Sequence, residues 1–219
     1  MVNYTSAIER WNAMGRVSDA RERLIDAANE LTGKLGYNAV TVDAICEQAG
    51  VKKGSFYHYF ESKAALCKAA IEEWWQTNSR PTLDTAFSAS NPPLERLHLY
   101  FDALHQKMLD RQKRGEKVLG CLLFSVAMEG GGVDQEVVEA TQRVLQRKRR
   151  YFEAAIRDAE QAGLLDVTDV ETAVQAVYSL FEGATARARI QNSPEPIVGL
   201  YEQVLRLLGV ESSAERKRA

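Results

Sequence analysis

The chain has little proline and no run of alternating β-branched residues. Only five of its 219 residues are proline, and no segment alternates apolar and polar residues as a half-buried strand does. These absences exclude a β-rich fold and predict an all-α protein. The 45% hydrophobic content is sufficient for a full core, formed by one continuous unit or by two closely packed domains.

Cysteine, long apolar runs and an excess of one charge sign are also scarce. Three cysteines are an odd number in a chain with no recognisable secretory signal, which predicts reduced thiols in the cytoplasm. No apolar run is long enough to predict a membrane span. The net charge of -2 excludes a global basic field, so that any nucleic-acid surface must be local.

The most informative segment is TVDAICEQAGVKKGSFYHYFESK, residues 41–63. Thr41 is a predicted N-cap for a short helix whose apolar stripe runs at i, i+3, i+4 and i+7 from Val42 to Ala49. Gly50 suits a position of positive φ, and Lys52 and Lys53 open a second short helix. The segment therefore predicts a helix-turn-helix.

The second helix has two different faces. Phe56 and Phe60 are four residues apart and point inward, which leaves hydroxyls, a glycine and lysines for a groove with phosphate walls. The alternative is a generic helical hairpin with a solvated lysine face, but the three successive aromatic residues 57–59 favour nucleic acid. We predict DNA contacts from Thr41, Lys52, Lys53, Gly54, Ser55, Tyr57, His58, Tyr59 and Lys63.

The block from Arg21 to Leu66, with AGVKKGSFYHYFESKAAL at its centre, resembles the DNA-binding domain of the TetR family of bacterial transcriptional regulators. The threonine opening, the AGV turn, KGSFYHYF and the following SKxxL all fall at the family's spacing. The resemblance covers the first third of the chain. It implies a repressor that binds a palindromic DNA operator as a homodimer and is released by a small organic effector.

The remaining pattern predicts a small head on a larger helical body. We expect a flexible arm at 1–17, a DNA-binding domain at 18–66, a ligand-binding and dimerisation domain at 67–210, and a disordered tail at 211–219. The first helix is expected from Ser18 or Asp19 to Leu35, and the fourth from Lys63 to Ser79, followed by a linker at Pro81. Further helices are expected at 94–113, 117–130, 134–162, 168–191 and 195–208.

The last two expected helices carry more small and apolar residues than a lone terminal helix needs. An intramolecular core is one explanation, and resemblance to the family implies the other, a four-helix interface with a second copy. We predict interface positions at Ala176, Leu180, Gly183, Ala184, Arg187, Tyr201, Val204 and Leu208.

Cys121 follows Gly120 near an expected helix start, where free N–H groups and the helix dipole lower a thiol pKa. The GCL segment resembles a TetR subgroup that senses small electrophilic or unsaturated compounds. That subgroup usually reads GCLxGN, whereas Phe124 and Ser125 stand here in place of Gly and Asn. Cys121 is therefore either a thiol-based redox or electrophile sensor or a small buried hydrophobe, the usual role of a free cysteine.

An aromatic cluster predicts a cavity for a small organic ligand, although the same residues also suit a plain core. The predicted lining is Trp74, Trp75, Phe101, His105, Cys121, Phe124, Met128, Tyr178 and Phe181. His98 and His105 lie about 10 Å apart along one helix, too far to share one ion, so no metal is predicted.

Two other classes of function stay open. An enzyme centred on Cys121 would need a nucleophile with a base and an orienting group, and neither that arrangement nor a cofactor-binding loop is recognisable. A helical adaptor would use the head for protein contacts. Both leave the KGSFYHYF surface unexplained, so the sequence favours a ligand-responsive DNA-binding regulator without enzymatic activity or cofactor.

Overall fold

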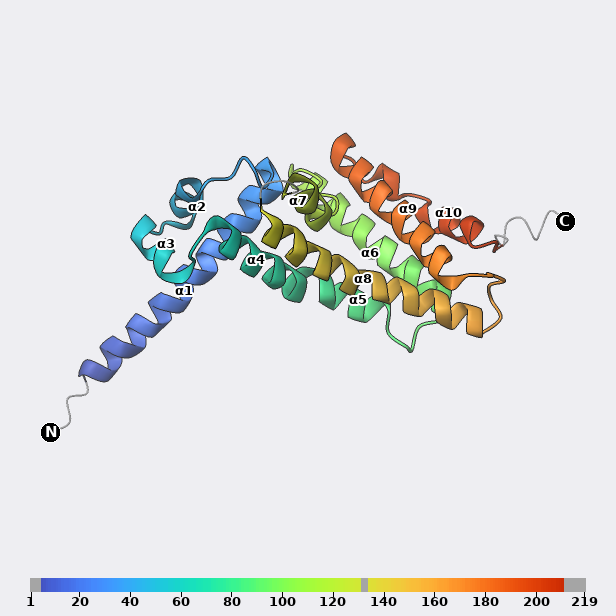
Figure 1. The fold of residues 1–219 in the computed structure, drawn as a ribbon, viewed down its shortest axis with the longest axis horizontal. Coiled ribbons are helices and arrows are strands. Elements are labelled where there is room, and N and C mark those ends of the chain that lie inside the picture. Colours follow the sequence, from blue (N-terminus) through green and yellow to red (C-terminus); the bar gives the residue numbers. More distant parts are fainter. Residues whose placement is uncertain (1–4, 131–133, 211–219) are drawn as a thin grey trace. The chain divides into compact units, whose positions relative to one another are not determined.

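A computed structural model describes residues 5–130 and 134–210, and every regular element in these ranges is helical (Figure 1). The all-α prediction is confirmed. The chain forms two compact units, residues 1–74 with 126–141, and residues 75–125 with 142–219. This division differs from the predicted boundary after Leu66. The predicted tail at 211–219, and residues 1–4 of the predicted arm, lie outside the described residues.

The first unit contains four complete helices, α1 (Thr5–Leu35), α2 (Val42–Ala49), α3 (Lys53–Tyr59) and α4 (Lys63–Trp74). Helix α1 packs against α2 and α4. It begins at Thr5 rather than at Ser18 or Asp19, because no proline interrupts the backbone between residues 5 and 35. The helix ends at Leu35, as predicted, and Gly36 follows it at φ +88°.

Residues 126–141 of the first unit come from the end of α7 (Leu122–Gly130) and the start of α8 (Gln135–Gln161). Hydrogen bonds join these residues to the turn that follows α1. The Asn38 side chain donates to the Glu129 carbonyl at 2.8 Å, and the Tyr37 hydroxyl donates to Asp134 at 2.5 Å. A stretch expected to belong to the body is thus part of the first unit.

The expected fourth helix does not run unchanged to Ser79. After Trp74 the backbone forms a π-helix, η1 (Trp75–Ser79), and then α5 (Arg80–Ala86) with Pro81 in its first turn. Proline lacks an N–H group, so it cannot donate to the carbonyl four residues earlier, and the helical pitch changes there. Pro81 therefore marks a change of helix type rather than a linker.

The other elements of the second unit are α6 (Pro93–Lys113), most of α8, α9 (Val170–Gln191), η2 (Glu195–Ile197) and α10 (Leu200–Leu207). Helix α5 packs on α6, and α10 packs on α6 and α9. Two expected helices are shorter than predicted. Gly120 at φ +62° delays α7 to Leu122, and Gly199 at φ +70° separates η2 from α10.

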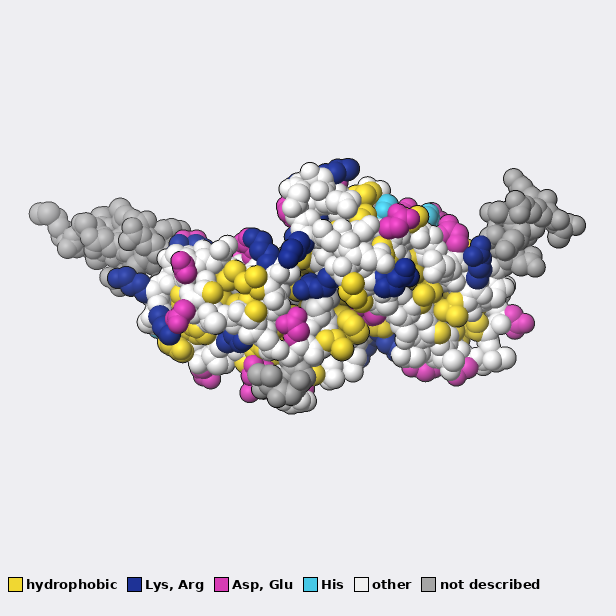
Figure 2. All heavy atoms as spheres, turned by 90° about the horizontal axis from the view of Figure 1, so that it is seen from above, with side chains coloured by type: hydrophobic (Ala, Val, Ile, Leu, Met, Phe, Trp, Pro, Cys, Tyr) yellow, Lys and Arg dark blue, Asp and Glu magenta, His cyan; other side chains and the backbone are white. Residues whose placement is uncertain are grey.

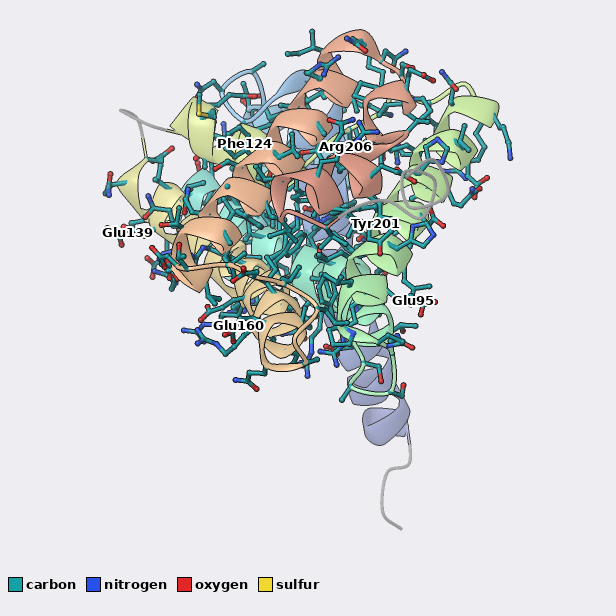
Figure 3. The ribbon with its side chains drawn as sticks, turned by 90° about the vertical axis from the view of Figure 1, so that its right-hand side faces the viewer. Glu95, Phe124, Glu139, Glu160, Tyr201 and Arg206 are labelled. Atoms are coloured by element: carbon teal, nitrogen blue, oxygen red, sulfur yellow. The ribbon has the colours of Figure 1, made fainter. Side chains whose placement is uncertain are left out.

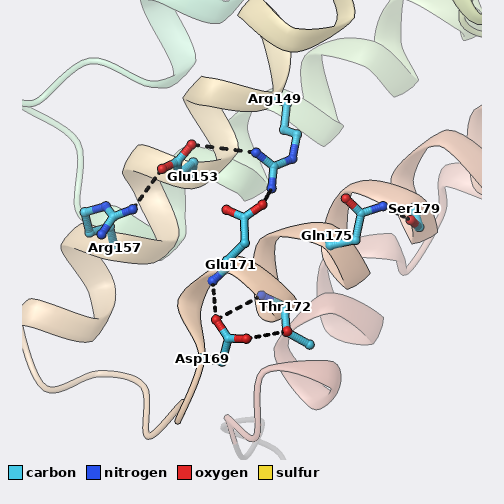
Figure 4. A network of polar contacts seen from close by, with 8 residues as sticks. All are labelled: Arg149, Glu153, Arg157, Asp169, Glu171, Thr172, Gln175 and Ser179. Carbon is cyan, nitrogen blue, oxygen red and sulfur yellow. Dashed lines mark hydrogen bonds and ion pairs between the residues drawn. The ribbon is translucent and has the colours of Figure 1, made fainter.

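A polar network at the surface joins α8 to α9 (Figure 4). Asp169 caps α9 by accepting from the Glu171 and Thr172 backbone N–H groups at 2.9 and 3.3 Å. Arg149 of α8 pairs with Glu171, and Glu153 accepts from Arg157 at 2.8 Å. The Glu171 side chain is 68% exposed, so this network orients the helix start and contributes little stability.

Candidate DNA-binding surface and effector site

The turn between α2 and α3 has the geometry expected from its sequence. The Thr41 hydroxyl accepts from the Ala44 N–H at 3.1 Å, and Gly50 adopts φ +62° and ψ +37°. The Val51 N–H donates to the Cys46 carbonyl at 2.9 Å, which closes the helix end. Phe56 is completely buried in the core of the unit. The two short helices are therefore held in a fixed corner, with one face of α3 turned outward.

The outward face of α3 carries most of the predicted DNA contacts. Lys52, Lys53, Gly54, Ser55, Tyr57 and His58 are all exposed. Tyr57 is 54% exposed although its ring edge meets Phe56 at 5.1 Å. A Cβ added at Gly54 would meet nothing within 4 Å, so the backbone there can be approached closely.

Three predicted contacts lie elsewhere, and the first of them, Thr41, is the N-cap of α2. Tyr59 is half-buried and packs against the core of the unit. The side of this short helix that faces the core therefore includes Tyr59 as well as Phe56, with Phe60 following directly after the helix. The Lys63 ammonium donates to the Tyr37 and Val40 carbonyls, both at 3.1 Å, and lies 4.1 Å from the centre of the Tyr37 ring. Lys63 thus caps the chain after α1 instead of presenting a free charge to phosphate.

Basic charge on this surface is local and partly balanced. Lys53 pairs with Asp43 of α2 at 2.7 Å, and the hydrogen bond to Asp43 raises the pKa of the exposed Lys53 ammonium. On the face drawn in Figure 2, blue, magenta and apolar side chains are interspersed. Lys52 makes no side-chain cap of α3 and leaves its charge in solvent.

The second unit contains an aromatic cluster that includes part of the predicted cavity lining. The Phe101 and Phe181 rings stack with centroids 5.8 Å apart and 14° between planes, and Tyr178 lies 5.9 Å from Phe181. Trp75, 4% exposed, meets Tyr151 at 6.4 Å. The central rings of the cluster, Tyr100 and Phe152, are not among the predicted lining residues.

The other predicted lining residues do not belong to this aromatic cluster. Trp74 and Met128 belong to the first unit, and Met128 is 71% exposed. Trp74 and Trp75 are neighbours in the chain, so they point about 100° apart and only one of them is buried. His105 and Phe124 are partly exposed, and Figure 3 labels Phe124 on α7. The nine predicted lining residues are therefore divided between the two units, and a single cavity lined by all of them stays a prediction.

A buried ion pair lies beside the aromatic cluster. Lys148 of α8 and Glu182 of α9 approach to 3.4 Å, and each side chain is 8% exposed. The Lys148 Nζ also lies 4.2 Å from the centre of the Phe181 ring and 3.8 Å from the Cys121 Sγ. Burial opposes the charge of Lys148, but Cys121, Glu182 and two tyrosines together hold its pKa above that of free lysine.

Sequence reasoning missed both partners of this pair. Lys148 stands in the run RKRR, which looks like a solvated face. Glu182 offered a weak signal, since it follows Phe181 on a helix whose neighbouring positions are apolar.

Cys121 does not have the lowered pKa that its position suggested. Burial raises the pKa of the thiol to about 11, although the nearby Lys148 ammonium acts in the opposite direction. Cys121 precedes the first residue of α7, and desolvation outweighs the helix dipole there. Cys46 and Cys67 are buried, and burial raises the pKa of Cys67 to about 12.

The predicted dimer positions divide into two groups. Ala184, Val204 and Leu208 are at most 6% exposed and pack inside the chain's own core. Their assignment to an interface is wrong, because α10 packs the side that carries Val204 and Leu208 against α9 and α6, and Ala184 is itself buried on α9. The remaining positions stay at least partly exposed: Ala176, Leu180, Gly183, Arg187 and Tyr201.

His98 of α6 contacts an aromatic ring and a carboxylate. The His98 ring stacks on Tyr201 with centroids 4.7 Å apart, and its Nε2 lies 3.6 Å from Asp102. Figure 3 labels Tyr201 and Glu95, and the Glu95 charge adds to burial in raising the pKa of Tyr201. In the described ranges no three His, Cys, Asp or Glu side chains gather as metal ligands, and no helix there is long and apolar enough to cross a membrane.

Comparison with known families covers both ends of this architecture. The family described as bacterial regulatory proteins, tetR family, matches residues 24–70. The family described as tetracyclin repressor-like, C-terminal domain, matches residues 93–204. The two matches include the outward face of α3 and, apart from Trp75, the aromatic cluster described above.

Individual proteins are similar over most of their length. Transcriptional regulator AcuR of Cereibacter sphaeroides is 34% identical over 180 residues, which cover 81% of this chain and 80% of that protein. HTH-type transcriptional repressor NemR of Escherichia coli K12 is 23% identical over 191 residues, 87% of this chain and 94% of that protein. The crystal structure of regulatory protein TetR from Rhodobacter sphaeroides superposes with a TM-score of 0.76 at 33% identity, covering 86% of this chain and 98% of that one.

Proposed function

This chain belongs to the tetR family of bacterial regulatory proteins, and from this premise we propose that it binds a palindromic operator as a homodimer that a small organic effector releases. It is a DNA-binding transcriptional regulator and not an enzyme. The relative NemR is named a repressor, which favours repression. A cytoplasmic location is part of the same proposal.

The observation that carries DNA binding is the exposed face of α3. Six of the predicted contact residues lie there in solvent, on a helix fixed from behind by the buried Phe56. Lys52 and Lys53 are suited to phosphates, whereas Ser55 and Tyr57 have the hydroxyls that read base edges. One such short helix makes too few base contacts for a unique site, so two copies are needed.

Alanine at Lys52 or Lys53 is expected to weaken operator binding on all sequences and to flatten its salt dependence. Each lost phosphate contact lowers the slope of log K against log salt by about 0.9. Ser55→Ala and Tyr57→Phe should in addition change the preferred bases. The measurement is fluorescence anisotropy at several salt concentrations, with an operator selected from random duplexes.

Lys34→Ala supplies the control, because Lys34 is an exposed lysine of the same unit that pairs with Glu30. Its affinity should stay close to wild type. Unchanged binding in all four α3 variants, or a selected site without dyad symmetry, would contradict the proposal.

The exposed side of α9 supports association of two copies. Ala176, Leu180, Gly183, Arg187 and Ile190 recur at intervals of three and four residues and so lie along one side of the helix. Ile190 is 82% exposed, and a Cβ at Gly183 would meet nothing within 4 Å. Small residues let a second helix approach closely.

Leucine at Gly183 is expected to convert the dimer into monomers without unfolding the chain, because its side chain has open space in the isolated protomer. Sedimentation velocity should then give half the mass, and operator affinity should fall by about 100-fold or more because two half-sites are no longer bound together. Gly54→Leu, at an equally open glycine of α3, should remain dimeric. A Gly183→Leu protein that sediments with wild type would refute this interface.

Release by an effector requires differential binding. A compound that lowers operator affinity about 100-fold must prefer the released state by about 2.7 kcal/mol. The aromatic cluster of the second unit supports such a site, since apolar walls with a few polar groups bind small organic molecules.

A thiol response at Cys121 is the second candidate function, and the GCL resemblance remains a prediction. The Lys148 ammonium 3.8 Å from the sulfur favours it, because a cation stabilises a thiolate. The raised pKa weighs against fast reaction at neutral pH.

The rate of Cys121 alkylation by iodoacetamide is expected to rise about tenfold for each pH unit between pH 7 and pH 9. With a pKa of about 11 the thiolate is only about one part in 10,000 at pH 7. Mass spectrometry of the modified peptide measures the rate, and a free cysteine peptide, which levels off near its pKa of about 8.5, is the reference. A rate that is already flat between pH 6 and pH 8 would mean a preformed thiolate and would favour the sensor.

A further inference from the structure

We infer that the Lys148–Glu182 pair is the polar end of the effector site and binds a neutral aromatic molecule with an adjacent hydrogen-bond acceptor and donor, of the carboxamide class. The expectation that such a ligand releases DNA rests on the proposed function. The expectation that the ligand binds at this pair does not depend on DNA binding.

The first observation is an unused carboxylate oxygen. Glu182 Oε1 accepts from Lys148, whereas Glu182 Oε2 is buried and has no hydrogen-bond partner. The Tyr178 hydroxyl donates to the Leu145 carbonyl at 3.3 Å, and both it and the Cys121 thiol lie close enough to interact with the Glu182 carboxylate. Neither gives Oε2 a well-formed hydrogen bond, which is unfavourable for a buried acceptor, so a better-placed donor on a ligand would stabilise this oxygen.

The second observation is the charge of the surroundings. Lys148 and Glu182 cancel one another, and the other titratable groups that face them are Tyr100 of α6, Cys121 and Tyr178 of α9. Burial raises the pKa of the Tyr100 and Tyr178 phenols and of the Cys121 thiol, so all three stay neutral near pH 7. A charged ligand would leave one charge unpaired among apolar side chains, and a neutral ligand would not.

The third observation is the weak contact between Lys148 and Cys121. The Nζ to Sγ distance is 3.8 Å, and sulfur is a poor acceptor. A carbonyl oxygen would bind this ammonium hydrogen better. The ligand would then accept from Lys148 and donate to Glu182 Oε2 at the same time.

The ligand's acceptor for Lys148 and its donor for Glu182 must lie close together, because the Lys148 Nζ is only 3.4 Å from Glu182 Oε1. A carboxamide has its oxygen and nitrogen on one carbon, about 2.3 Å apart from bond lengths of about 1.23 and 1.33 Å. This spacing matches two parallel hydrogen bonds to adjacent groups.

The aromatic rings beside the pair select for a flat apolar group attached to the carboxamide. The Phe181 ring lies under the Lys148 Nζ, and Phe152 and Tyr178 meet edge to face at 5.3 Å. Cys121 and Tyr178 are partly exposed, so solvent reaches the border of the cluster. An aryl carboxamide combines both requirements.

The test uses four probes of the same shape: benzamide, benzoate, benzamidinium and acetophenone. They differ in charge and in the hydrogen-bond donors and acceptors beside the ring. Calorimetric titration of the full chain should show that benzamide binds about tenfold or more tighter than each of the others. Lys148→Met/Glu182→Leu, which removes both charges together, should abolish this preference and leave the four affinities alike.

The matched control is Arg149→Met/Glu171→Leu, which removes a surface ion pair between the same two helices and should keep the preference. Equal binding of benzamide and acetophenone to wild type, a preference that survives in the Lys148→Met/Glu182→Leu protein, or no saturable binding of any probe would each overturn the inference. Operator anisotropy with the same probes separates the two proposals. If benzamide binds selectively but does not change operator affinity, the ligand site stands and release of DNA through it is refuted. If another compound releases DNA equally from wild type and from the double variant, effector release stands and the Lys148–Glu182 pair is not part of the effector site.

Discussion

Replacing Lys148 alone with methionine is expected to lower the free energy of unfolding by about 3–5 kcal/mol at pH 7, because Glu182 is left as an unpaired buried carboxylate. Methionine fills a similar volume and has a similar helix propensity. The loss therefore comes from charge and not from packing. Urea unfolding followed by circular dichroism at fixed protein concentration measures it.

The double variant Lys148→Met/Glu182→Leu is expected to recover most of that loss, since well-packed apolar residues can replace a buried ion pair at little cost.

Arg149→Met provides the comparison at the surface. It removes a partner of Glu171, which is 68% exposed, and should cost at most about 1 kcal/mol. A Lys148→Met loss no larger than that, or a double variant as unstable as the single one, would show that the buried pair is not what stabilises this part of the unit.

Alanine at Gly120 is expected to be almost as damaging, at about 3 kcal/mol or more. Gly120 has φ +62°, and a Cβ there would lie 2.4 Å from the Thr185 carbonyl oxygen and 3.0 Å from the Arg189 Cβ of α9. The Thr185 carbonyl belongs to the backbone of α9, so it cannot move away from the added Cβ as the end of a flexible side chain could. The segment before α7 would have to move off α9, with loss of the 3.1 Å hydrogen bond from Arg189 to the Leu119 carbonyl.

Gly163→Ala separates strain from steric overlap. Gly163 has a similar φ of +69°, but a Cβ there would meet nothing within 4 Å. It should lose only about 1 kcal/mol, the cost of the left-handed conformation for a residue with a Cβ. Equal losses at the two glycines, measured by thermal and urea unfolding, would rule out close approach to α9 as the reason for glycine at 120.

The DNA-binding corner could be predicted because its determinants are local. A capping hydroxyl at Thr41, a left-handed glycine at Gly50 and two inward rings spaced by four residues are all set within a few residues of chain. The same holds for the helical class, which follows from periodicity and scarce proline. The family resemblance added the operator, the dimer and the effector as expectations.

Positions that depend on partners distant in sequence could not be predicted this way. Lys63 looked like a phosphate ligand, but it caps the Tyr37 and Val40 carbonyls. Val204 and Leu208 looked available for a second copy, yet α10 buries them against its own neighbours. An amphipathic pattern specifies that a face is covered and not which helix covers it.

The sequence by itself determined the helical class and the turn between α2 and α3, and the motif around that turn indicated the family, since short-range sterics, capping and periodicity act on neighbouring residues. Only the tertiary structure decided that Lys148, from a run of basic residues, meets Glu182 thirty-four positions later beside Cys121. Burial changes the chemistry of such groups: it raised the Cys121 pKa that a helix start was expected to lower. Desolvation depends on every element packed around a residue, and that information is absent from its neighbours in the chain.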